Sequence, residues 1–508
     1  MGRIGRQFVQ SMDEDPNVEA FQAWCDIFLE QMPTLRGSDG DTWVMSKELT
    51  FELFEEVLRR MPKRKGVGAS GWSVELLLAA DANLRRMFYE AIMADLAGGT
   101  IADSWRRVLY VLLVKPAPND ARRISERREI ALMAQEMKLL LQMVRRVSYA
   151  RIVGRLAKEQ AGWLAGFGAT DPAVIAALVI QQARRLGHPL WLLYVDLATF
   201  FPKINREIVA VAELMHGLPQ EVVEIATLIY GTHDGSQAAV RCQYDSAGGL
   251  SGEFENYMGA LMGCVLSPDK AKVLLNSALV AIQVVCKGVR LWGHSTAEQD
   301  RVWRSILQMC YADDHLAACT SVGELRKVWA VWQCWELVSG CKLGIKKKAK
   351  TVVTGVAYDA KGRPIAVEDP KLEYRDDSFV PFMRYDEAYK HLGIARRADG
   401  VDDAAWRGVK RKFEGALRRL RKLNVPRIRW MSLSKCPTCC WEESRTTTCR
   451  RCTSHGHRRS SSSASGERST TEMRPDATQR RESSYTRQYV PLAGTRGRRD
   501  ARTFTRLG

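Results

Sequence analysis

Tyr311-Ala312-Asp313-Asp314 is the stretch of sequence that decides the fold, because it places an acidic turn between two apolar runs. Ile306 to Tyr311 predicts a strand, and Leu316 to Cys319 predicts its hairpin partner across the turn. Leu190 to Val195 predicts another strand, whose nearly continuous apolar character indicates that both of its faces are covered. Asp196 follows that strand directly. The sequence therefore predicts carboxylates at the ends of separate buried strands.

Such carboxylates suit phosphodiester synthesis from a nucleoside triphosphate. Negative charge in that reaction spreads over the attacking oxygen, the phosphorus and the leaving pyrophosphate, and two Mg²⁺ ions held by hard oxygen ligands stabilise it. Asp196, Asp313 and Asp314 would supply the oxygens if their strands meet at one edge of a sheet. Each piece alone also has a simpler interpretation, because Asp at a strand end is commonly a turn or cap residue.

The basic balance of the chain points to a polyanionic partner. The 508 residues include 76 Lys and Arg against 58 Asp and Glu, a net charge of +18. Nucleic acid and an anionic membrane surface are the usual partners of such a charge. We see no membrane span and no signal peptide, so we expect an intracellular protein. Eight of the thirteen cysteines are scattered from Cys25 to Cys341, as reduced and buried cysteines would be.

Strand and helix patterns alternate along the chain and predict an α+β core with a mainly antiparallel sheet. Val108 to Val114 reads as a strand. Apolar periodicity predicts helices over residues 18–29, 46–60, 130–156, 269–285 and 322–339. After Lys435 the composition changes, and the last 73 residues contain fifteen arginines and no lysine. Either a disordered tail or a shifted reading frame would produce this composition.

Read in order, the motifs resemble those of non-LTR retrotransposon reverse transcriptases, with group II intron-type enzymes as close relatives. Lys65 to Trp72 is similar to the family's first block, and Val111 to Pro116 resembles its strand ending in Lys-Pro. Arg128 to Leu132 is similar to the block Arg-Pro-Ile-Ser/Ala-Leu, with Glu129 in place of proline. The resemblance implies that Lys115 and Arg128 line the path of the triphosphate.

Asp196 to Phe201 resembles the first palm block of this family, an Asp followed five positions later by an aromatic residue. The resemblance implies that Asp196 binds Mg²⁺ and that Phe201 excludes the 2′-hydroxyl, which distinguishes RNA from DNA monomers. Phe201 has an alternative reading as a core residue beside Phe200. Asp313 and Asp314 match the third palm block, whose Tyr-Ala form favours reverse transcription over RNA-templated RNA synthesis.

Three further blocks complete the resemblance. Gly259 to Pro268 looks like the second palm block, with Met262 where glutamine is usual and with Gly263 allowing close backbone approach.

Gly344 to Thr351 is similar to a block in which a lysine, here Lys350, neutralises the leaving pyrophosphate. Lys350 is also one of five lysines between Lys342 and Lys350, which could form a solvated run. Tyr389 to Ile394 resembles a primer-grip hairpin, whose most recognisable residues are Leu392 and Gly393.

The resemblance implies a right-hand polymerase fold. We expect an N-terminal helical extension over residues 1–60, fingers and palm over 61–395, the start of a thumb over 396–435, and a tail over 436–508. A basic amphipathic helix over residues 402–423 would be the first thumb element and contact phosphates. The tail contains four cysteines with zinc-ligand spacing, which are possible Zn²⁺ ligands: Cys436, Cys439, Cys449 and Cys452.

The implied function is RNA-templated DNA synthesis within a retrotransposon, with two Mg²⁺ ions, an RNA template, a DNA primer and deoxynucleoside triphosphates. We find no endonuclease signature, so a nicking activity would come from elsewhere, and we expect the protein to act in the nucleus. Two alternatives remain. A decayed reverse transcriptase-like protein would only bind nucleic acid, and a group II intron-type maturase would also assist splicing.

Overall fold

A six-stranded sheet carries the acidic turn, with the strand order β12-β11-β3-β10-β9 and β13 beside β11. In this computed structural model, β3 spans Leu190–Val195 and pairs antiparallel with β10 (Asp314–Cys319) on one side and β11 (Val352–Tyr358) on the other. The outer strands are β9 (Gln308–Tyr311), β12 (Pro364–Ala366) and β13 (Phe382–Met383), of which β13 runs parallel to β11.

The structure describes residues 18–29, 45–115, 127–231, 240–246, 249–294, 301–345, 350–375, 378–401 and 403–422. All of them belong to one unit, Met1–Asn424. The second unit, Val425–Gly508, lies outside the described residues, and so do the four cysteines predicted as possible zinc ligands, Cys436, Cys439, Cys449 and Cys452.

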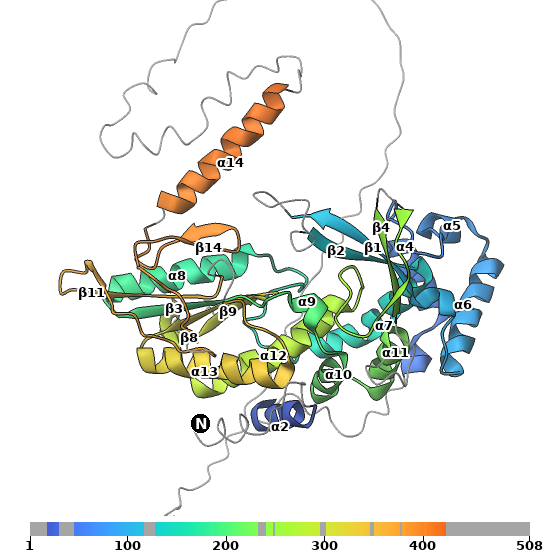
Figure 1. The fold of residues 1–508 in the computed structure, drawn as a ribbon, viewed down its shortest axis with the longest axis horizontal. Coiled ribbons are helices and arrows are strands. Elements are labelled where there is room, and N and C mark those ends of the chain that lie inside the picture. Colours follow the sequence, from blue (N-terminus) through green and yellow to red (C-terminus); the bar gives the residue numbers. More distant parts are fainter. Residues whose placement is uncertain are drawn as a thin grey trace, which may run out of the picture. The chain divides into compact units, whose positions relative to one another are not determined.

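Both faces of β3 are buried, as its apolar sequence predicts. Leu193 and Val195 contribute to the main core, whereas Leu192 and Tyr194 contribute to a second one. Helices α12 (Ser267–Val285) and α13 (Val322–Ser339) cover the first face, and α8 (Thr170–Leu186) covers the other (Figure 1). These bounds confirm the helices expected at 269–285 and 322–339.

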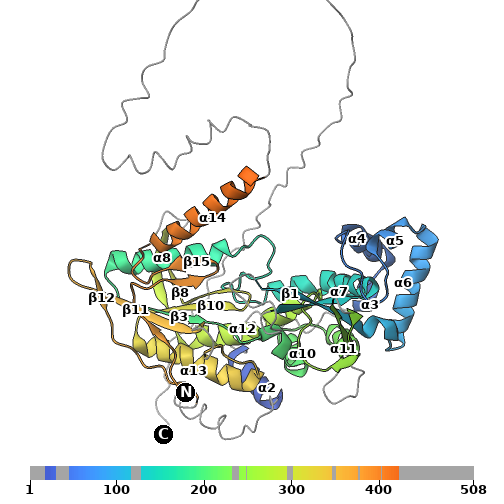
Figure 2. The ribbon, with the colours of Figure 1, turned by 45° about the horizontal axis from the view of Figure 1, so that its top comes forward.

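A second sheet, of five strands, lies beside the central sheet (Figure 2). β1 (Arg107–Val114) pairs antiparallel with β2 (Arg127–Met133) and parallel with β4 (Val240–Ser246). The short strands β5 (Gly249–Leu250) and β6 (Phe254–Asn256) both pair with β4. Each of the two sheets contains one parallel pairing and is otherwise antiparallel, which confirms the predicted α+β fold with mainly antiparallel sheets.

Two sequence predictions are wrong at their boundaries. The helix expected from Ile130 begins only at α7 (Gln135–Val153), because Ile130–Met133 pair with β1 as part of β2. A short apolar run fits a strand as well as a helix, and here the neighbouring strand decides. Ile306 does not belong to the hairpin strand either. It ends β8 (Arg301–Ile306), which pairs with β7 (Val289–His294) in a separate two-stranded sheet.

The first part of the chain is helical where described, as expected for residues 18–29 and 46–60. Helix α2 spans Val18–Leu29, and the second predicted helix is divided into α3 (Met45–Glu48) and α4 (Phe51–Arg60). Thr50 causes the division, because its hydroxyl accepts a hydrogen bond from the Leu53 amide at 3.3 Å and caps α4.

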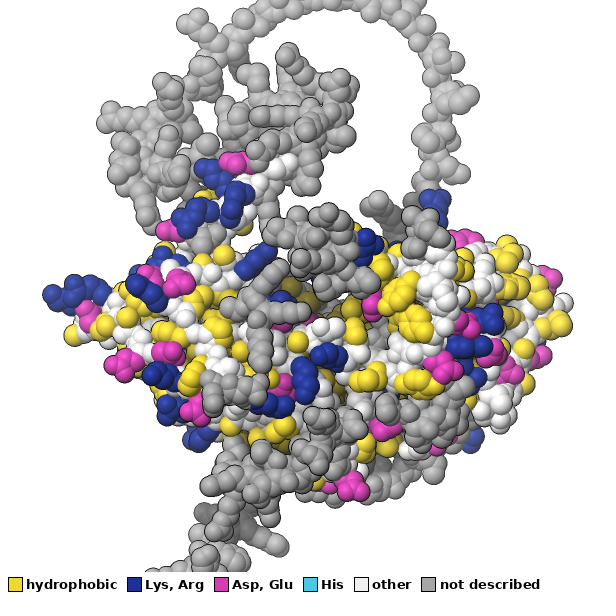
Figure 3. All heavy atoms as spheres, viewed as in Figure 1, with side chains coloured by type: hydrophobic (Ala, Val, Ile, Leu, Met, Phe, Trp, Pro, Cys, Tyr) yellow, Lys and Arg dark blue, Asp and Glu magenta, His cyan; other side chains and the backbone are white. Residues whose placement is uncertain are grey.

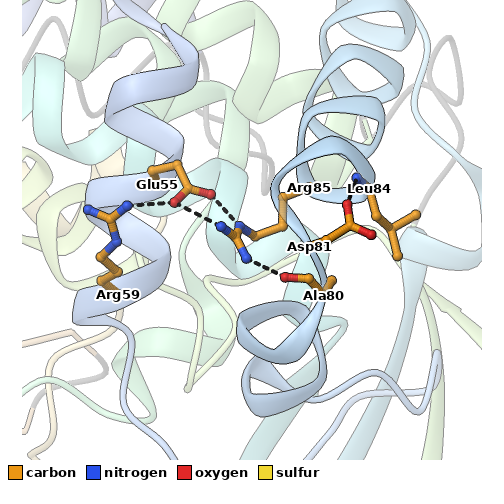
Figure 4. Close-up of polar contacts among 6 residues, drawn as sticks. All are labelled: Glu55, Arg59, Ala80, Asp81, Leu84 and Arg85. Atoms are coloured by element: carbon orange, nitrogen blue, oxygen red, sulfur yellow. Dashed lines mark hydrogen bonds and ion pairs between the residues drawn. The ribbon is translucent and has the colours of Figure 1, made fainter.

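Helices α5 (Val74–Ala79) and α6 (Ala82–Ala97) follow α4. Figure 4 shows how α4 and α6 are joined: Glu55 accepts hydrogen bonds from Arg59 of its own helix and from Arg85 of α6. Arg85 also donates to the Ala80 carbonyl, while Asp81 caps α6 by accepting from the Leu84 amide at 2.9 Å. Because Glu55 and Arg85 are mostly buried, this contact fixes the two helices against each other.

The remaining elements surround the two sheets. They are the 3-10 helix η1 (Asp103–Arg106), α9 (Phe200–Lys203), α10 (Arg206–Met215), α11 (Gln220–Tyr230), the hairpin strands β14 (Tyr389–His391) and β15 (Ile394–Arg396), and α14 (Asp403–Lys422). Helix α14 confirms the predicted basic helix, and Lys and Arg side chains gather on it (Figure 3). Among the described helices, none has both the length and the apolar character needed to cross a bilayer.

Because the side chains of β3 are buried, shortening one of them should lower the stability of the fold. Leu193 is fully buried between the sheet and the main core, so Leu193→Ala should lower the free energy of unfolding by about 2–5 kcal/mol. Urea denaturation followed by circular dichroism would measure this change. Leu84→Ala on α6 is the matched control, since Leu84 is 51% exposed and its loss should change stability little. Equal effects of the two substitutions would contradict the described packing.

Candidate functional site

The three aspartates predicted as a site lie at one edge of the central sheet. Tyr311 pairs with Asp314, so Ala312 and Asp313 form the two-residue loop between β9 and β10. β3 ends at Val195 opposite His315, so Asp196, the next residue, lies at the same edge as Asp314. The structure therefore brings Asp196 to the acidic turn, as their positions after buried strands predict.

The acidic turn has a constrained backbone. Ala312 has a φ of 60°, a left-handed conformation that glycine usually takes and that tight hairpin loops require. Thr199, which follows the first aspartate by three positions, also has a positive φ of 55°. Positive φ values at non-glycine residues often mark functional sites, because the surrounding structure must hold them in place.

The carboxylates are partly withdrawn from water and repel one another. Burial, together with the charges of Asp313 and Asp196, raises the pKa of Asp314 to about 6. Burial also raises the pKa of Asp313, to which the charge of Asp196 adds, while Lys350 and Arg128 act in the opposite direction. A positive charge placed among these groups would therefore be strongly favoured.

Lys350 supplies one such charge. Its ammonium lies 2.8 and 3.0 Å from the two carboxylate oxygens of Asp196, which is 15% exposed. Thr351 is fully buried next to it, and its hydroxyl accepts from the Asp196 amide at 3.2 Å. Lys350 therefore contacts the acidic edge, while its side chain is also 57% exposed to solvent.

The chain before Lys350 lies directly against Asp196. The Gly344 amide donates to the Asp196 carbonyl at 2.8 Å, and the Ala198 amide donates to the Lys342 carbonyl at 2.7 Å. A Cβ atom on Gly344 would stand 2.8 Å from a carboxylate oxygen of Asp196. A side chain at this position would therefore displace the Asp196 carboxylate.

The two aromatic residues after Asp196 differ in how deeply they are buried. Phe200 is 4% exposed and part of the main core. Phe201 is only partly buried and packs edge-on against Trp163, with ring centroids 5.6 Å apart. Phe201 also packs against the main core, so its placement is compatible with both readings, a core residue and a residue of the site.

The second sheet brings the remaining predicted nucleotide-contacting residues together. The Ala131 amide of β2 donates to the Met262 carbonyl at 2.6 Å, and Gly263, with a φ of 113°, lies so close that a Cβ would be 2.5 Å from the Ala131 carbonyl oxygen. Arg128 of the same strand is exposed and near enough to Asp313 to lower its pKa. Lys115 directly follows β1, which pairs with β2.

The predicted Leu392-Gly393 pair forms the turn of the β14–β15 hairpin, with φ values of 49° and 81°. Tyr389 of this hairpin stacks on Tyr194, with ring centroids 4.2 Å apart, and its hydroxyl donates to the Lys350 carbonyl. Burial raises the pKa of Tyr389 to about 12, and the charges of Asp196 and Asp314 add to the shift. The hairpin is therefore attached to the edge that carries the aspartates.

The donors suit a divalent cation, since carboxylate oxygens are the ligands that Mg²⁺ prefers. In the part of the chain that the structure describes, no three His, Cys, Asp or Glu side chains are arranged as a metal site as they stand. The Lys350 ammonium contacts both oxygens of Asp196. Asp196 would therefore have to exchange this contact for the cation, with Asp313 and Asp314 as the other candidate ligands.

Sequence reasoning did not predict the contacts that support the aspartates. Thr351 and Tyr389 lie in blocks that the resemblance includes, but their bonds to Asp196 and Lys350 were not expected, and Gln160 stands in a stretch with no distinctive local pattern. Their partners lie far away along the chain; Thr351, for example, follows Asp196 by 155 residues.

No protein-family model and no curated protein is similar enough to this chain to count as a match. The function must therefore be inferred from the residues of the site itself.

The raised pKa of Asp314 predicts a pH-dependent stability. Its folded-state pKa of about 6 exceeds the unfolded value near 3.9, so ionisation disfavours the folded state as the pH rises through about 6. In metal-free buffer, Asp314→Asn should therefore be more stable than the wild type at pH 7.5 by roughly 1–2 kcal/mol, and the difference should vanish near pH 4. Chemical denaturation at both pH values measures it.

Asp359→Asn is the matched control. Asp359 lies after β11 and accepts hydrogen bonds from Arg363, which lower its pKa. Its removal should not stabilise the protein at pH 7.5. A wild type as stable as Asp314→Asn at pH 7.5 would show that the acidic edge carries no electrostatic penalty.

Proposed function

We propose that the chain is an RNA-directed DNA polymerase of a retrotransposon, which extends a DNA primer on an RNA template. The observation that carries the proposal is the convergence of Asp196 with Asp313 and Asp314 at one sheet edge, with Lys350 against them. The order of these segments along the chain resembles that of non-LTR retrotransposon reverse transcriptases, and this resemblance supplies the substrate class.

The three carboxylates would hold Mg²⁺, which when bound stabilises the attacking and the leaving oxygens of phosphoryl transfer. The raised pKa values of Asp313 and Asp314 support this assignment, because a site built for divalent cations concentrates negative charge that is unfavourable without them. Lys350 would leave Asp196 and turn to the departing pyrophosphate, for which its 57% exposed side chain has the freedom.

The other side chains would bind and select the nucleotide. Arg128 is exposed near Asp313 and would contact the triphosphate, with Lys115 at the end of the neighbouring strand. Phe201 would lie under the sugar and reject a 2′-hydroxyl. Met262 and Gly263 would lie along the base pair.

The proposed fold is that of a right-handed polymerase. The central sheet with its acidic edge would be the palm, and the sheet of β1, β2 and β4 would belong to the fingers. The β14–β15 hairpin, with Leu392 and Gly393 at its turn, would grip the primer. The basic helix α14 would begin the thumb and contact phosphates of the template–primer duplex.

A second candidate is a decayed polymerase that keeps only nucleic-acid binding. Met262 favours it, because a thioether stands where the related enzymes use a glutamine that can form hydrogen bonds. Retention of the three aspartates at one edge favours the catalytic proposal.

Primer extension distinguishes the two candidates. With a DNA primer on an RNA template, deoxynucleoside triphosphates and Mg²⁺, the wild type should extend the primer, and Asp313→Ala should lose at least about 100-fold in rate. Asp95→Ala on α6 is the matched control and should keep full activity. A wild type that binds the duplex but adds nothing, or an Asp313→Ala variant as active as the wild type, would overturn the polymerase proposal.

Phe201→Ala tests the selection of the sugar. Removing the ring should raise ribonucleotide incorporation relative to deoxynucleotide incorporation by at least about tenfold, because nothing then opposes the 2′-hydroxyl. The ratio of kcat/KM for matched dNTP and NTP measures this change. Phe413→Ala on α14, where Phe413 is 61% exposed, is an aromatic control. An unchanged ratio would remove Phe201 from the selection of the sugar.

A further inference from the structure

The short segment Gln160–Trp163 touches both the acidic turn and Phe201, although neither part of the site is near it in sequence. We propose that this segment is a positioning strap: Gln160 fixes the turn that carries Asp313, and Trp163 fixes the ring of Phe201. The inference rests on the proposed polymerase function and assigns to that reaction two positioning residues with separate effects.

Gln160 binds the amide and the carbonyl of Ala312 in the turn. Its side-chain oxygen accepts from the Ala312 amide at 3.2 Å, and its side-chain nitrogen donates to the Ala312 carbonyl at 3.3 Å. The same oxygen accepts from the Gly162 amide at 2.8 Å, and the nitrogen also contacts the Cys310 sulfur at 3.3 Å. Gln160 is 1% exposed, so water cannot replace these bonds.

The backbone of the strap runs alongside β9. The Ala161 amide donates to the Cys310 carbonyl at 2.8 Å, and the Cys310 amide donates to the Glu159 carbonyl at 3.0 Å. Gly162 allows the close approach, because a Cβ there would stand 2.0 Å from the Ala312 amide nitrogen. The strap is therefore built against the turn by main chain and side chain together.

These contacts explain how Ala312 keeps its unusual backbone. A left-handed alanine costs of order 1 kcal/mol or more and persists only when its surroundings determine it. Gln160 satisfies both polar groups of Ala312 in that conformation. Without these bonds, the Ala312 amide loses its partner and the Ala312 carbonyl keeps only the weak Cys310 thiol donor at 3.3 Å. The loop is then free to relax, which would move the Asp313 carboxylate.

Trp163 is the other end of the strap. It is held in a left-handed conformation, with a φ of 55°, which is rare for a bulky residue. Its ring meets that of Phe201 at 89°. Its carbonyl accepts from the ammonium of Lys272 at 3.4 Å, and Lys272 is fully buried and paired with Asp269 at 2.7 Å.

The backbone of Trp163 is therefore held in place. Asp269 is itself bound to the partly exposed Arg145 at 2.6 Å, so the carbonyl of Trp163 ends a chain of charged side chains on α12 and α7, of which Asp269 and Lys272 are buried. Separating a buried ion pair is costly, because either partner is then left as an unpaired buried charge. The indole ring of Trp163 is thus held in place, and its packing against Phe201 limits where the ring of Phe201 can lie.

The two ends have different kinetic consequences. Displacing Asp313 affects transfer of any nucleotide, so loss of Gln160 should lower kcat for dNTP and NTP alike. Displacing Phe201 affects only the contact with the 2′-position, so loss of Trp163 should change the dNTP/NTP ratio of kcat/KM and leave kcat for dNTP nearly unchanged.

Single-turnover primer extension on an RNA template with Mg²⁺, using the full chain, tests both ends. We expect Gln160→Met to reduce kcat about ten- to 100-fold for both nucleotides at an unchanged ratio, as loss of two buried hydrogen bonds predicts. We expect Trp163→Leu to reduce discrimination about three- to tenfold, the effect of losing one aromatic pair, and Trp163→Phe to restore most of it.

Two controls separate positioning from loss of stability. Gln308→Met removes a buried glutamine of the same hairpin, bonded to Leu279 and His315, and should leave kcat within about threefold of the wild type. Trp329→Leu removes a buried tryptophan of α13 and should leave the sugar ratio unchanged. Thermal melts of all variants identify any that are unfolded.

The outcomes are distinct. The wild type could be active while Trp163→Leu keeps the wild-type dNTP/NTP ratio of kcat/KM, or while Gln160→Met keeps the wild-type kcat. Either result would contradict the positioning role of the strap and leave the polymerase proposal standing. Controls that behave like the strap variants would also overturn it, since the effects would then follow from stability. A wild type that adds neither nucleotide would overturn the polymerase proposal and this inference with it.

Discussion

Burial of β3 on both faces is the constraint on which the rest of the structure depends. All six residues from Leu190 to Val195 are buried, alternately in the two cores. A charged side chain cannot stand within such a strand without a large desolvation cost. Asp196 is therefore the first position at which the strand can offer a carboxylate, and the edge of the sheet becomes the place for polar chemistry.

The carboxylates at that edge repel one another when no cation lies among them. The pKa of Asp314 stands near 6 because burial and two neighbouring carboxylates disfavour its charge. Lys350 relieves part of the repulsion through Asp196, and Arg128 acts on Asp313 from the second sheet. The site thus draws its positive charges from segments far apart in the chain, which couples the two sheets at the point where a polyanionic substrate would arrive.

The features predictable from sequence were those with a local pattern. The buried strand β3 follows from a continuous apolar run and the acidic hairpin from two apolar runs around a turn, and both are present. The helix predicted from Ile130 is wrong at its start, because a brief apolar run fits a strand as well as a helix. Lys350 could not be separated from its lysine neighbours, since only the pairing of Gly344 with Asp196 brings it to the site. Gln160 left no local signal, because its partner Ala312 lies 152 residues away.

The same topology sets an order of events during synthesis. β3 pairs with β10 and β11, which the ribosome makes much later, and Thr351 follows Asp196 by 155 residues. Until those strands emerge, the apolar strand β3 can pack against α8, which is synthesised earlier, but the backbone groups on both of its edges are unpaired. Non-local pairing of this kind slows folding and leaves the nascent chain prone to aggregation. Expression of this protein should therefore depend on chaperones that shield β3 while the chain is incomplete.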